Sequence, residues 1–329
     1  GENSMKHLMI VLGFMCLSCP TLADTLSLSI DELQTWNAIG SDGEVNSQGE
    51  AVQERIMGKP DFVKVIDLPA NDANVELSKK VGFFMDVKRK GFCSGSLVGP
   101  DLFLTNHHCI AADNGGIIPA TNIVVWMEYT SPKSKPDANS TAQATQILSY
   151  HESLDYALLK LNKPLGNRYG WLQLEQNPNL VQQIRSVKII QHPDSRPKEI
   201  VTNNTQVINC QSPFTGNKAY LCYLADTQGG SSGSPVFSID GDKIVALHHR
   251  GVEGRFNLGT RILFIAEKIK PYLPVAGAST SSGTSNNATP AKTSAKPNPA
   301  AAPKAKPTPK PADPPSDTQD NTGGWKPII

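Results

Sequence analysis

The chain has 329 residues, and its 31 lysines and arginines nearly balance its 30 aspartates and glutamates, for a formal net charge of +1. This balance gives no electrostatic basis for binding nucleic acid or an acidic membrane surface. Beyond about the first twenty residues, no stretch is apolar for long enough to span a bilayer. We therefore expect neither a nucleic-acid-binding protein nor an integral membrane segment in the mature chain.

Two segments at the start of the chain are expected to be absent from the mature protein. Residues 1–4 precede Met5 and are interpreted as a remnant of cloning. Residues 5–23 combine a basic start, an apolar core and a small-residue end, which is typical of a signal peptide cleaved after Ala23. We therefore expect an exported protein, either secreted or periplasmic.

Residues 24–55 are polar and are predicted to be a propeptide or N-terminal extension. A short helix is expected after Ser29, because Glu32 follows it at the spacing of a capping box. The sequence Arg55-Ile56 is similar to a processing junction that would leave Ile56 as a mature N-terminus. The alternative is that this segment simply begins an edge strand.

From residue 81 onward, short apolar segments separated by turn residues predict an antiparallel barrel or sandwich with few helices. The expected strands are 81–87, 96–105, 123–129, 143–149, 157–161, 186–191, 205–209, 219–224, 235–239 and 243–248. One helix is expected over residues 260–270, where apolar residues recur at helical spacing and Pro271 follows.

The last 54 residues, 276–329, hold ten of the 25 prolines and very few large apolar side chains. Such a segment cannot bury enough surface to offset its ordering entropy, so we expect a disordered tail rich in Pro, Ala and Lys. Its lysines make it mildly basic. Two interpretations of the tail remain open, namely contact with a cell surface or wall, and a passive spacer.

Two of the six cysteines fall in the expected signal peptide, which leaves Cys93, Cys109, Cys210 and Cys222. An even number of cysteines in an exported chain predicts disulfides, and three pairings are open from the count alone. A zinc site is the alternative. It is disfavoured because none of these cysteines are at the close spacing of about two to four residues that zinc knuckles use.

Residues 230–235 read Gly-Ser-Ser-Gly-Ser-Pro, a run of small residues that predicts a tight turn presenting one hydroxyl outward. Ser232 is the candidate nucleophile. The backbone N–H groups of Gly230 and Ser232 would converge on one point, as an oxyanion hole requires. The glycines would let a substrate backbone approach closely.

Two motifs upstream supply partners for this serine. His107 and His108 directly precede Cys109, and Asp155 begins the run Asp-Tyr-Ala-Leu-Leu. A base, a carboxylate that orients it and a nucleophile are therefore present in the order His, Asp, Ser. Because the two histidines are adjacent, only one of them can face the site.

These motifs, with Phe-Cys-Ser-Gly-Ser-Leu at 92–97 and Val-Ala-Leu-His-His at 245–249, resemble the trypsin/chymotrypsin-like serine peptidases. The resemblance is strongest to the bacterial secreted branch that includes the glutamyl endopeptidases, and it covers residues 56–275. It implies an all-β fold of two antiparallel six-stranded β-barrels packed around one catalytic cleft, with a C-terminal helix. Roughly 220 to 250 residues remain without the two ends, a normal size for such a pair.

The resemblance also implies the role of each residue. In the family the catalytic imidazole immediately precedes the cysteine, which assigns His108 rather than His107. His108, Asp155 and Ser232 then form the catalytic triad, and no metal or other cofactor is implied.

The resemblance pairs the cysteines as Cys93–Cys109 and Cys210–Cys222. It also reveals one departure from the animal trypsins. In those enzymes an aspartate just before the nucleophile pairs with the new N-terminal ammonium, but that position is Ser231 here. The same salt bridge therefore cannot form at this position.

Two substrate pockets remain open. Asp226 lies six residues before Ser232, where trypsin-like enzymes place the carboxylate that binds Lys or Arg. Thr227 and His248 match the positions at which glutamyl endopeptidases hold an acidic side chain. An Asp226 that is turned into the protein and hydrogen-bonded would leave Thr227 and His248 to accept Glu. We favour the acidic pocket because it uses two matched positions.

The sequence therefore predicts an exported serine endopeptidase that hydrolyses peptide bonds through an acyl-enzyme intermediate, with a preference for acidic residues. Its expected partners are protein or peptide substrates. The competing interpretation is a secreted, catalytically silent binding protein that retains the trypsin-like fold. An intact triad and an intact glycine turn argue against that interpretation.

Overall fold

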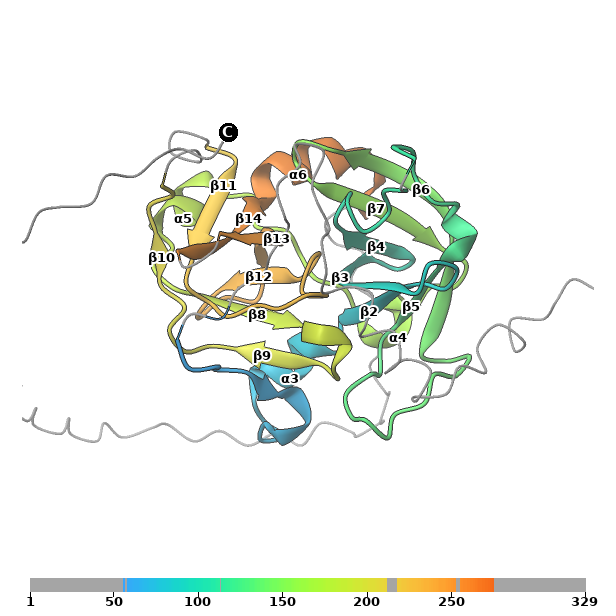
Figure 1. Cartoon of the computed structure of the whole chain (residues 1–329), viewed down its shortest axis with the longest axis horizontal. Helices are drawn as coiled ribbons and strands as arrows, with labels where there is room; N and C mark the ends of the chain where they lie inside the picture. Colours follow the sequence, from blue (N-terminus) through green and yellow to red (C-terminus); the bar gives the residue numbers. More distant parts are fainter. Residues whose placement is uncertain (1–55, 57, 113, 212–217, 253–254, 275–329) are drawn as a thin grey trace, which may run out of the picture. The chain divides into compact units, whose positions relative to one another are not determined.

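The computed structural model describes residues 56, 58–112, 114–211, 218–252 and 255–274, and all of them belong to one compact unit (Figure 1). The predicted signal peptide, N-terminal extension and C-terminal tail lie outside these residues. Arg55, one side of the predicted processing junction, lies outside them as well.

The first half of the described chain is a closed six-stranded antiparallel barrel, as the fold class predicts, with strand order β2-β3-β4-β7-β6-β5 (Figure 1). The bounds are β2 Val81–Asp86, β3 Gly91–Gly99, β4 Leu102–Thr105, β5 Ile123–Trp126, β6 Thr141–His151 and β7 Tyr156–Leu161. Every residue of β2 is buried. The reason is that alternate side chains enter two clusters, Phe84 with Phe103 on one face and Phe83 with Trp126 on the other.

The expected strand 96–105 is divided into two strands. β3 already begins at Gly91, and a turn at Pro100 and Asp101 separates it from β4. Proline has no backbone N–H to donate to a ladder, which explains why the strand cannot continue through this point. The two parts fold back on each other, and Leu97 pairs with Phe103.

The second half is an eight-stranded antiparallel sheet with the order β1-β9-β8-β12-β13-β14-β11-β10. The bounds are β1 Val63–Lys64, β8 Val187–Gln191, β9 Glu199–Val201, β10 Val207–Ile208, β11 Tyr220–Tyr223, β12 Pro235–Ser238, β13 Ile244–Val252 and β14 Phe256–Arg261. Where a second six-stranded barrel was expected, the strands form this one eight-stranded sheet. β8, β10, β11, β12 and β13 lie at expected strand positions, whereas β1, β9 and β14 were not expected.

The C-terminal helix α6, Ile262–Ile269, confirms the helix expected over 260–270. Its Ile265 is fully buried in a cluster that also contains Leu158 of the barrel and Leu247 of the second sheet. A single apolar cluster therefore joins the barrel, the sheet and the helix. β14 ends at Arg261 and α6 begins at the next residue, so no turn residues separate the two elements in the sequence. For this reason the sequence did not predict β14 as a strand.

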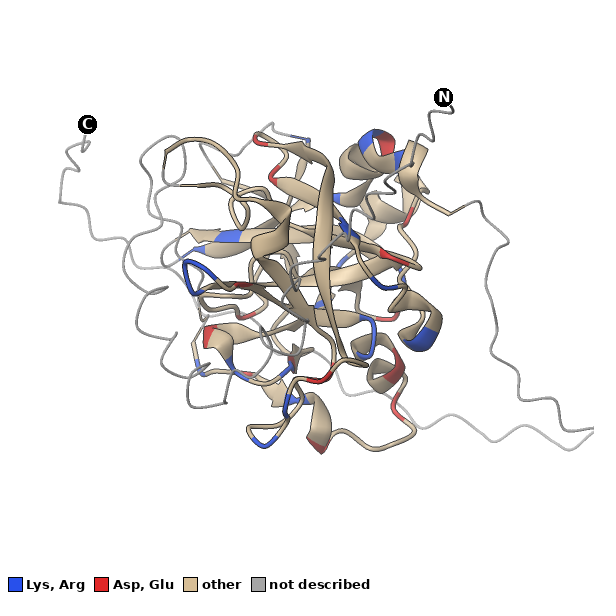
Figure 2. Ribbon diagram, turned by 90° about the vertical axis from the view of Figure 1, so that its right-hand side faces the viewer, with Lys and Arg blue, Asp and Glu red and all other residues tan. Residues whose placement is uncertain are grey.

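The other helices are η2 Val65–Asp67, α3 Ala73–Ser78, η3 Ala120–Asn122, α4 Gly166–Tyr169, α5 Pro178–Gln183, η4 Pro193–Ser195 and η5 Lys270–Tyr272. Within the described ranges, no helix has the length and apolar character needed to cross a membrane. On the face drawn in Figure 2, basic and acidic residues are interspersed rather than gathered into blocks of one sign.

Lys198 is a buried lysine at the junction of the two halves. Its Nζ donates to the carbonyl oxygen of Ser78 at 2.7 Å and to that of Met127 at 2.9 Å, and the residue is 1% exposed. Burial disfavours the charged form and lowers the pKa of Lys198 to about 7. This contact is therefore made by an amine that titrates near neutral pH.

Both predicted disulfides are present. Cys93 of β3 is bonded to Cys109, and Cys210 is bonded to Cys222 of β11. The first bridge ties the barrel strand to the segment that carries His108. The second bridge closes the connection between β10 and β11.

Removing the first bridge with the double variant Cys93→Ser/Cys109→Ser should lower the free energy of unfolding by about 2–5 kcal/mol, as measured in urea. It should also reduce peptide hydrolysis more than Cys210→Ser/Cys222→Ser does, because it lies beside His108. Non-reducing peptide maps of exported protein should recover both pairs. Free thiols at all four positions would contradict the pairing and the export of the chain.

Lys198 should make stability depend on pH above neutrality. Between about pH 7 and 10.5 the unfolded chain holds a proton on this lysine that the folded chain does not, so the free energy of unfolding should rise with pH across this window. The variant Lys198→Gln should remove that rise, whereas Lys243→Gln, at an exposed lysine, should keep it. Parallel pH profiles for wild type and Lys198→Gln in urea titrations would contradict this expectation.

Candidate active site

The candidate nucleophile lies in a loop between β11 and β12, which we call the nucleophile loop (residues 228–234). The Ser231 N–H donates to the Gln228 carbonyl at 2.9 Å and the Ser234 N–H donates to the Ser231 carbonyl at 3.0 Å, so the loop consists of two tight turns. Gly230 has φ +91°, a conformation that favours glycine. A Cβ there would lie 2.5 Å from the Phe92 ring, so the loop has room for glycine alone.

His108 and Asp155 lie together at one end of the barrel. His108 follows β4 and Asp155 immediately precedes β7, and these strands are neighbours in the barrel. Nδ1 of His108 is 2.8 Å from Oδ2 of Asp155, and the His108 N–H donates to Oδ1 at 3.0 Å. Nδ2 of Asn106 donates to the backbone carbonyl of Asp155 at 2.6 Å, so the backbone of Asp155 is held as well as its side chain.

Asp155 is held in a sparsely populated conformation and in its charged form. Its φ of +46° is rare for a residue with a side chain and persists only where surrounding contacts hold it. Burial would raise the pKa of Asp155, but the neighbouring His108 and its two hydrogen bonds outweigh burial and lower the pKa to about 2. The carboxylate is therefore ionised at neutral pH and can hold one tautomer of His108.

The two adjacent histidines face different surroundings. His107 stacks on Tyr150, with ring centroids 5.4 Å apart and planes 18° apart, and burial lowers its pKa. His108 contacts Asp155 instead. His108, and not His107, is therefore the histidine whose ring nitrogen contacts the carboxylate of Asp155.

The two adjacent serines also differ. Ser231 is fully buried, and its Oγ accepts a hydrogen bond from the Gln228 N–H at 3.1 Å. The carbonyl of Ser232 accepts from the Ser94 N–H at 2.8 Å, which ties the nucleophile loop to β3 of the barrel. Ser94 was part of the recognised motif, yet its contact with this loop was not anticipated.

A second histidine touches the carboxylate, and sequence reasoning gave it no role. Nδ1 of His249, on β13, is 3.5 Å from Oδ2 of Asp155. Burial lowers the pKa of His249 to about 3, so the ring is neutral at pH 7 and the contact is not an ion pair. The pair His248-His249 in the sequence was the available signal, but only His248 matched a pocket position.

Asp226, one of the two pocket candidates, is turned into the protein. It is 2% exposed, and its Oδ2 accepts the backbone N–H of Asp61 at 2.9 Å. Its own carbonyl accepts from Nε2 of Gln191 at 2.9 Å. The carboxylate is therefore occupied by the segment that leads into β1.

Thr227 and His248, the other pocket candidates, are both fully buried. Nδ1 of His248 is 2.7 Å from the hydroxyl of Tyr223. When Tyr223 donates to Nδ1, the ring proton of His248 lies on Nε2, which makes that nitrogen a hydrogen-bond donor. Thr227 directly follows Asp226 and directly precedes the nucleophile loop.

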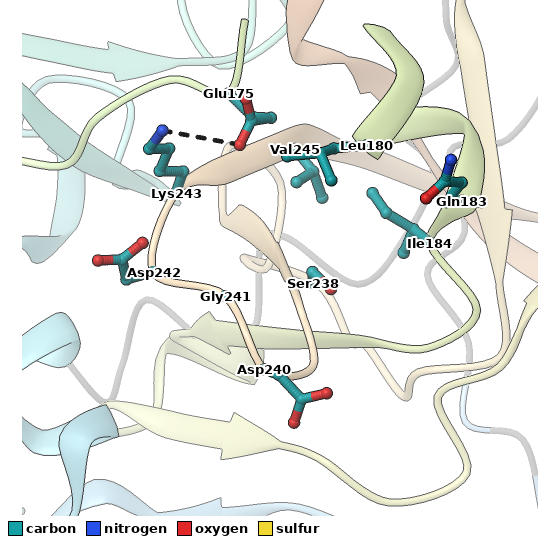
Figure 3. A pocket seen from close by; sticks show the side chains of 10 residues that line it. All are labelled: Glu175, Leu180, Gln183, Ile184, Ser238, Asp240, Gly241, Asp242, Lys243 and Val245. Carbon is teal, nitrogen blue, oxygen red and sulfur yellow. Dashed lines mark ion pairs between the residues drawn. The ribbon is translucent and has the colours of Figure 1, made fainter. Parts of the chain in front are cut away.

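Two other features of the described residues do not qualify as the site. Ligand atoms of Cys93, His108 and Cys109 lie within 4.8 Å of one another, but the two sulfurs are joined as a disulfide and offer no thiolate to a metal. A pocket of about 420 Å³ between α5 and the β12–β13 turn is lined by apolar side chains and by three carboxylates, of which Glu175 is paired with Lys243 at 3.8 Å (Figure 3). It contains no histidine.

A family model and several known proteins are similar to this chain. A family model described as a trypsin-like peptidase domain matches residues 93–247. Secreted RxLR effector protein 73 of Plasmopara viticola is 33% identical over 174 residues, which cover 49% of this chain and 41% of that protein. A glutamyl endopeptidase of Bacillus licheniformis is 29% identical over 188 residues, covering 52% of this chain and 56% of that protein. The chain thus spans about half the length of these curated relatives.

A solved structure of a Glu endopeptidase in complex with MPD has the same fold. It superposes with a TM-score of 0.50 at 20% sequence identity, covering 66% of this chain and 98% of that one. The closed barrel, the second sheet and the C-terminal helix thus have the fold of that solved structure. Residues 93–247 thus match a trypsin-like peptidase domain, and the chain resembles the glutamyl endopeptidases.

Proposed function

We propose that this chain is an exported serine endopeptidase in which Ser232 is the nucleophile, His108 the general base and Asp155 the carboxylate that orients the base. The observation that carries the proposal is the 2.8 Å contact between His108 Nδ1 and Asp155 Oδ2. It leaves Nε2 as the nitrogen that would face the nucleophile. The tight, glycine-dependent geometry of the nucleophile loop supports the same assignment.

In this mechanism, Ser232 Oγ attacks the carbonyl carbon of the scissile peptide bond while His108 Nε2 takes the hydroxyl proton. The tetrahedral intermediate collapses, His108 returns the proton to the leaving amine, and an acyl-enzyme remains. Water then attacks the ester by the same route and releases the acid. Asp155 stabilises the imidazolium that forms in each step, and its low pKa supports a charged carboxylate throughout.

The oxyanion of each tetrahedral intermediate would be held by the backbone N–H groups of Gly230 and Ser232. Backbone donors fixed before the reaction stabilise the developing charge without a cost of reorganisation. Gly230 is only partly buried. No acceptor in the described part of the chain is paired with this N–H.

The extent of the catalytic unit and its destination are part of the proposal. We assign residues 56–275 to the peptidase domain, because the described elements from β1 to η5 share their cores and fall within this range. Export is supported by the predicted signal peptide and by the word "secreted" in the name of one relative. Protein or peptide chains are then the substrates.

For specificity, we propose that Thr227 and His248 hold an acidic substrate side chain. The burial of Asp226 and its hydrogen bond from Asp61 support this choice, since a carboxylate occupied in this way is poorly placed to bind Lys or Arg. Nε2 of His248, with Nδ1 engaged by Tyr223, is the donor that a glutamate carboxylate would need. The names of several relatives, glutamyl endopeptidases, point to the same preference for those proteins.

Ser232→Ala should abolish peptide hydrolysis and labelling by a serine-directed phosphonate while leaving the melting temperature nearly unchanged, because it removes the nucleophile and little volume. The matched control is Ser231→Ala, which deletes a hydroxyl that contacts Gln228 and should still be labelled. Asp155→Asn should lower kcat by about 10⁴-fold through the wrong tautomer of His108. A wild-type protein that neither hydrolyses peptides nor is labelled would favour the silent binding protein.

The acidic pocket predicts that His248→Leu removes cleavage after Glu, with a loss of about a hundredfold or more in kcat/KM, while cleavage after small or apolar residues survives. Asp226→Ser should weaken folding through the lost contact with Asp61 but should not change the preferred residue. A peptide library gives both profiles. Wild-type cleavage only after Lys and Arg, abolished by Asp226→Ser, would overturn the acidic pocket.

A further inference from the structure

The segment that follows β8 contains the most unusual backbone near the nucleophile loop. Asp194 (φ 47°, ψ 43°) and Ser195 (φ 50°) are consecutive residues with side chains in the left-handed region. Such a pair is disfavoured unless the surrounding structure holds it in place. We call residues 192–196 the strap.

The strap holds the peptide bond that precedes Gly230. The Asp194 N–H donates to the Gly229 carbonyl at 2.6 Å. In a trans peptide the C=O of one residue and the N–H of the next point in opposite directions. With the Gly229 carbonyl directed at Asp194, the Gly230 N–H must point away from the strap. A reversed peptide would place a carbonyl oxygen where the donor is needed.

The peptide bond that follows Gly230 is held as well. Ser94 Oγ donates to the Gly230 carbonyl at 2.8 Å and accepts the backbone N–H of His192, at the start of the strap, at 2.9 Å. The Gly229 carbonyl therefore accepts a hydrogen bond from the strap itself. The Gly230 carbonyl accepts one from Ser94, whose hydroxyl is in turn bonded by the strap. The orientation of the Gly230 N–H is fixed on both sides.

Arg196 anchors the strap. Its guanidinium makes two hydrogen bonds to Glu199 on β9, at 3.2 and 2.9 Å, and a third to Asp194 at 3.2 Å. It also lies over the Phe62 ring, 5.2 Å from the centroid. Glu199 is 5% exposed, so the forked pair is much less screened by solvent than an ordinary surface pair. One side chain thus connects the left-handed turn to a buried strand.

We propose that the strap is a built-in device that orients the Gly230 N–H as an oxyanion donor, with Arg196, Asp194 and Ser94 as positioning residues. This inference rests on the proposed peptidase function. It accounts for the departure at Ser231, where the aspartate that would pair with a new N-terminus is absent.

The test uses the full chain and the variants Arg196→Gln, which removes the forked pair, and Ser94→Ala, which removes one oxygen. Each should lower kcat by about tenfold or more, less than the 10²–10³-fold loss of a whole oxyanion donor, with KM within about twofold. Phosphonate labelling of Ser232 should slow in parallel. The affinity for a substrate-derived peptide aldehyde, whose adduct places an oxyanion in the hole, should fall by the same factor, while that for the matching product peptide stays constant.

Arg168→Gln is the matched control, because Arg168 pairs with Glu128 on the barrel at 3.1 Å and should have no effect on kcat. Arg196→Lys, which keeps the charge but loses the fork, should lie between wild type and Arg196→Gln. If Arg196→Gln does not fold, Ser94→Ala decides. The proposed role of the strap would be overturned if Ser94→Ala and any folded Arg196→Gln kept the kcat and the aldehyde affinity of the wild type. That result would leave the proposed peptidase function intact.

Discussion

The site depends on backbone hydrogen bonds that cross from one half of the fold to the other. The candidate base and its carboxylate belong to the barrel, whereas the candidate nucleophile belongs to the second sheet. Ser94 donates from its N–H to the Ser232 carbonyl, and Thr260 of β14 returns a hydrogen bond from its hydroxyl to the Leu154 carbonyl beside Asp155. Because backbone carbonyls accept these bonds, few flexible side chains must be ordered to fix the geometry.

Burial then decides which groups at the site carry charge. At Asp155 burial is outweighed by His108, and the pKa falls to about 2. At His249 burial outweighs the attraction of the same carboxylate, and the pKa falls to about 3. Burial likewise lowers the pKa of His192 in the strap. Asp155 thus stands beside His249, whose imidazole is neutral at pH 7, and only His108 is placed to use the charge of the carboxylate.

The parts of the site that could be predicted are those encoded within a few adjacent residues. The glycine turn, the histidine before Cys109 and the aspartate before β7 were each identified from short motifs, and the resemblance supplied the fold class and the disulfide pairs. The contact of Asp61 with Asp226 joins residues 165 positions apart, so no local sequence pattern could predict it. The left-handed backbone of the strap could not be predicted for a different reason. Aspartate and serine do not by themselves indicate consecutive residues in the left-handed region.

The environment of Asp226 illustrates why position in a motif does not by itself define a pocket. The residue stands where a basic-specific enzyme has its recognition carboxylate, but the Asp61 N–H already occupies one oxygen, and Asn204 in turn donates to the Asp61 side chain. The same segment continues into β1, which pairs with β9. The buried hydrogen bond therefore gives the Asp226 side chain a structural role in holding the segment that leads into β1.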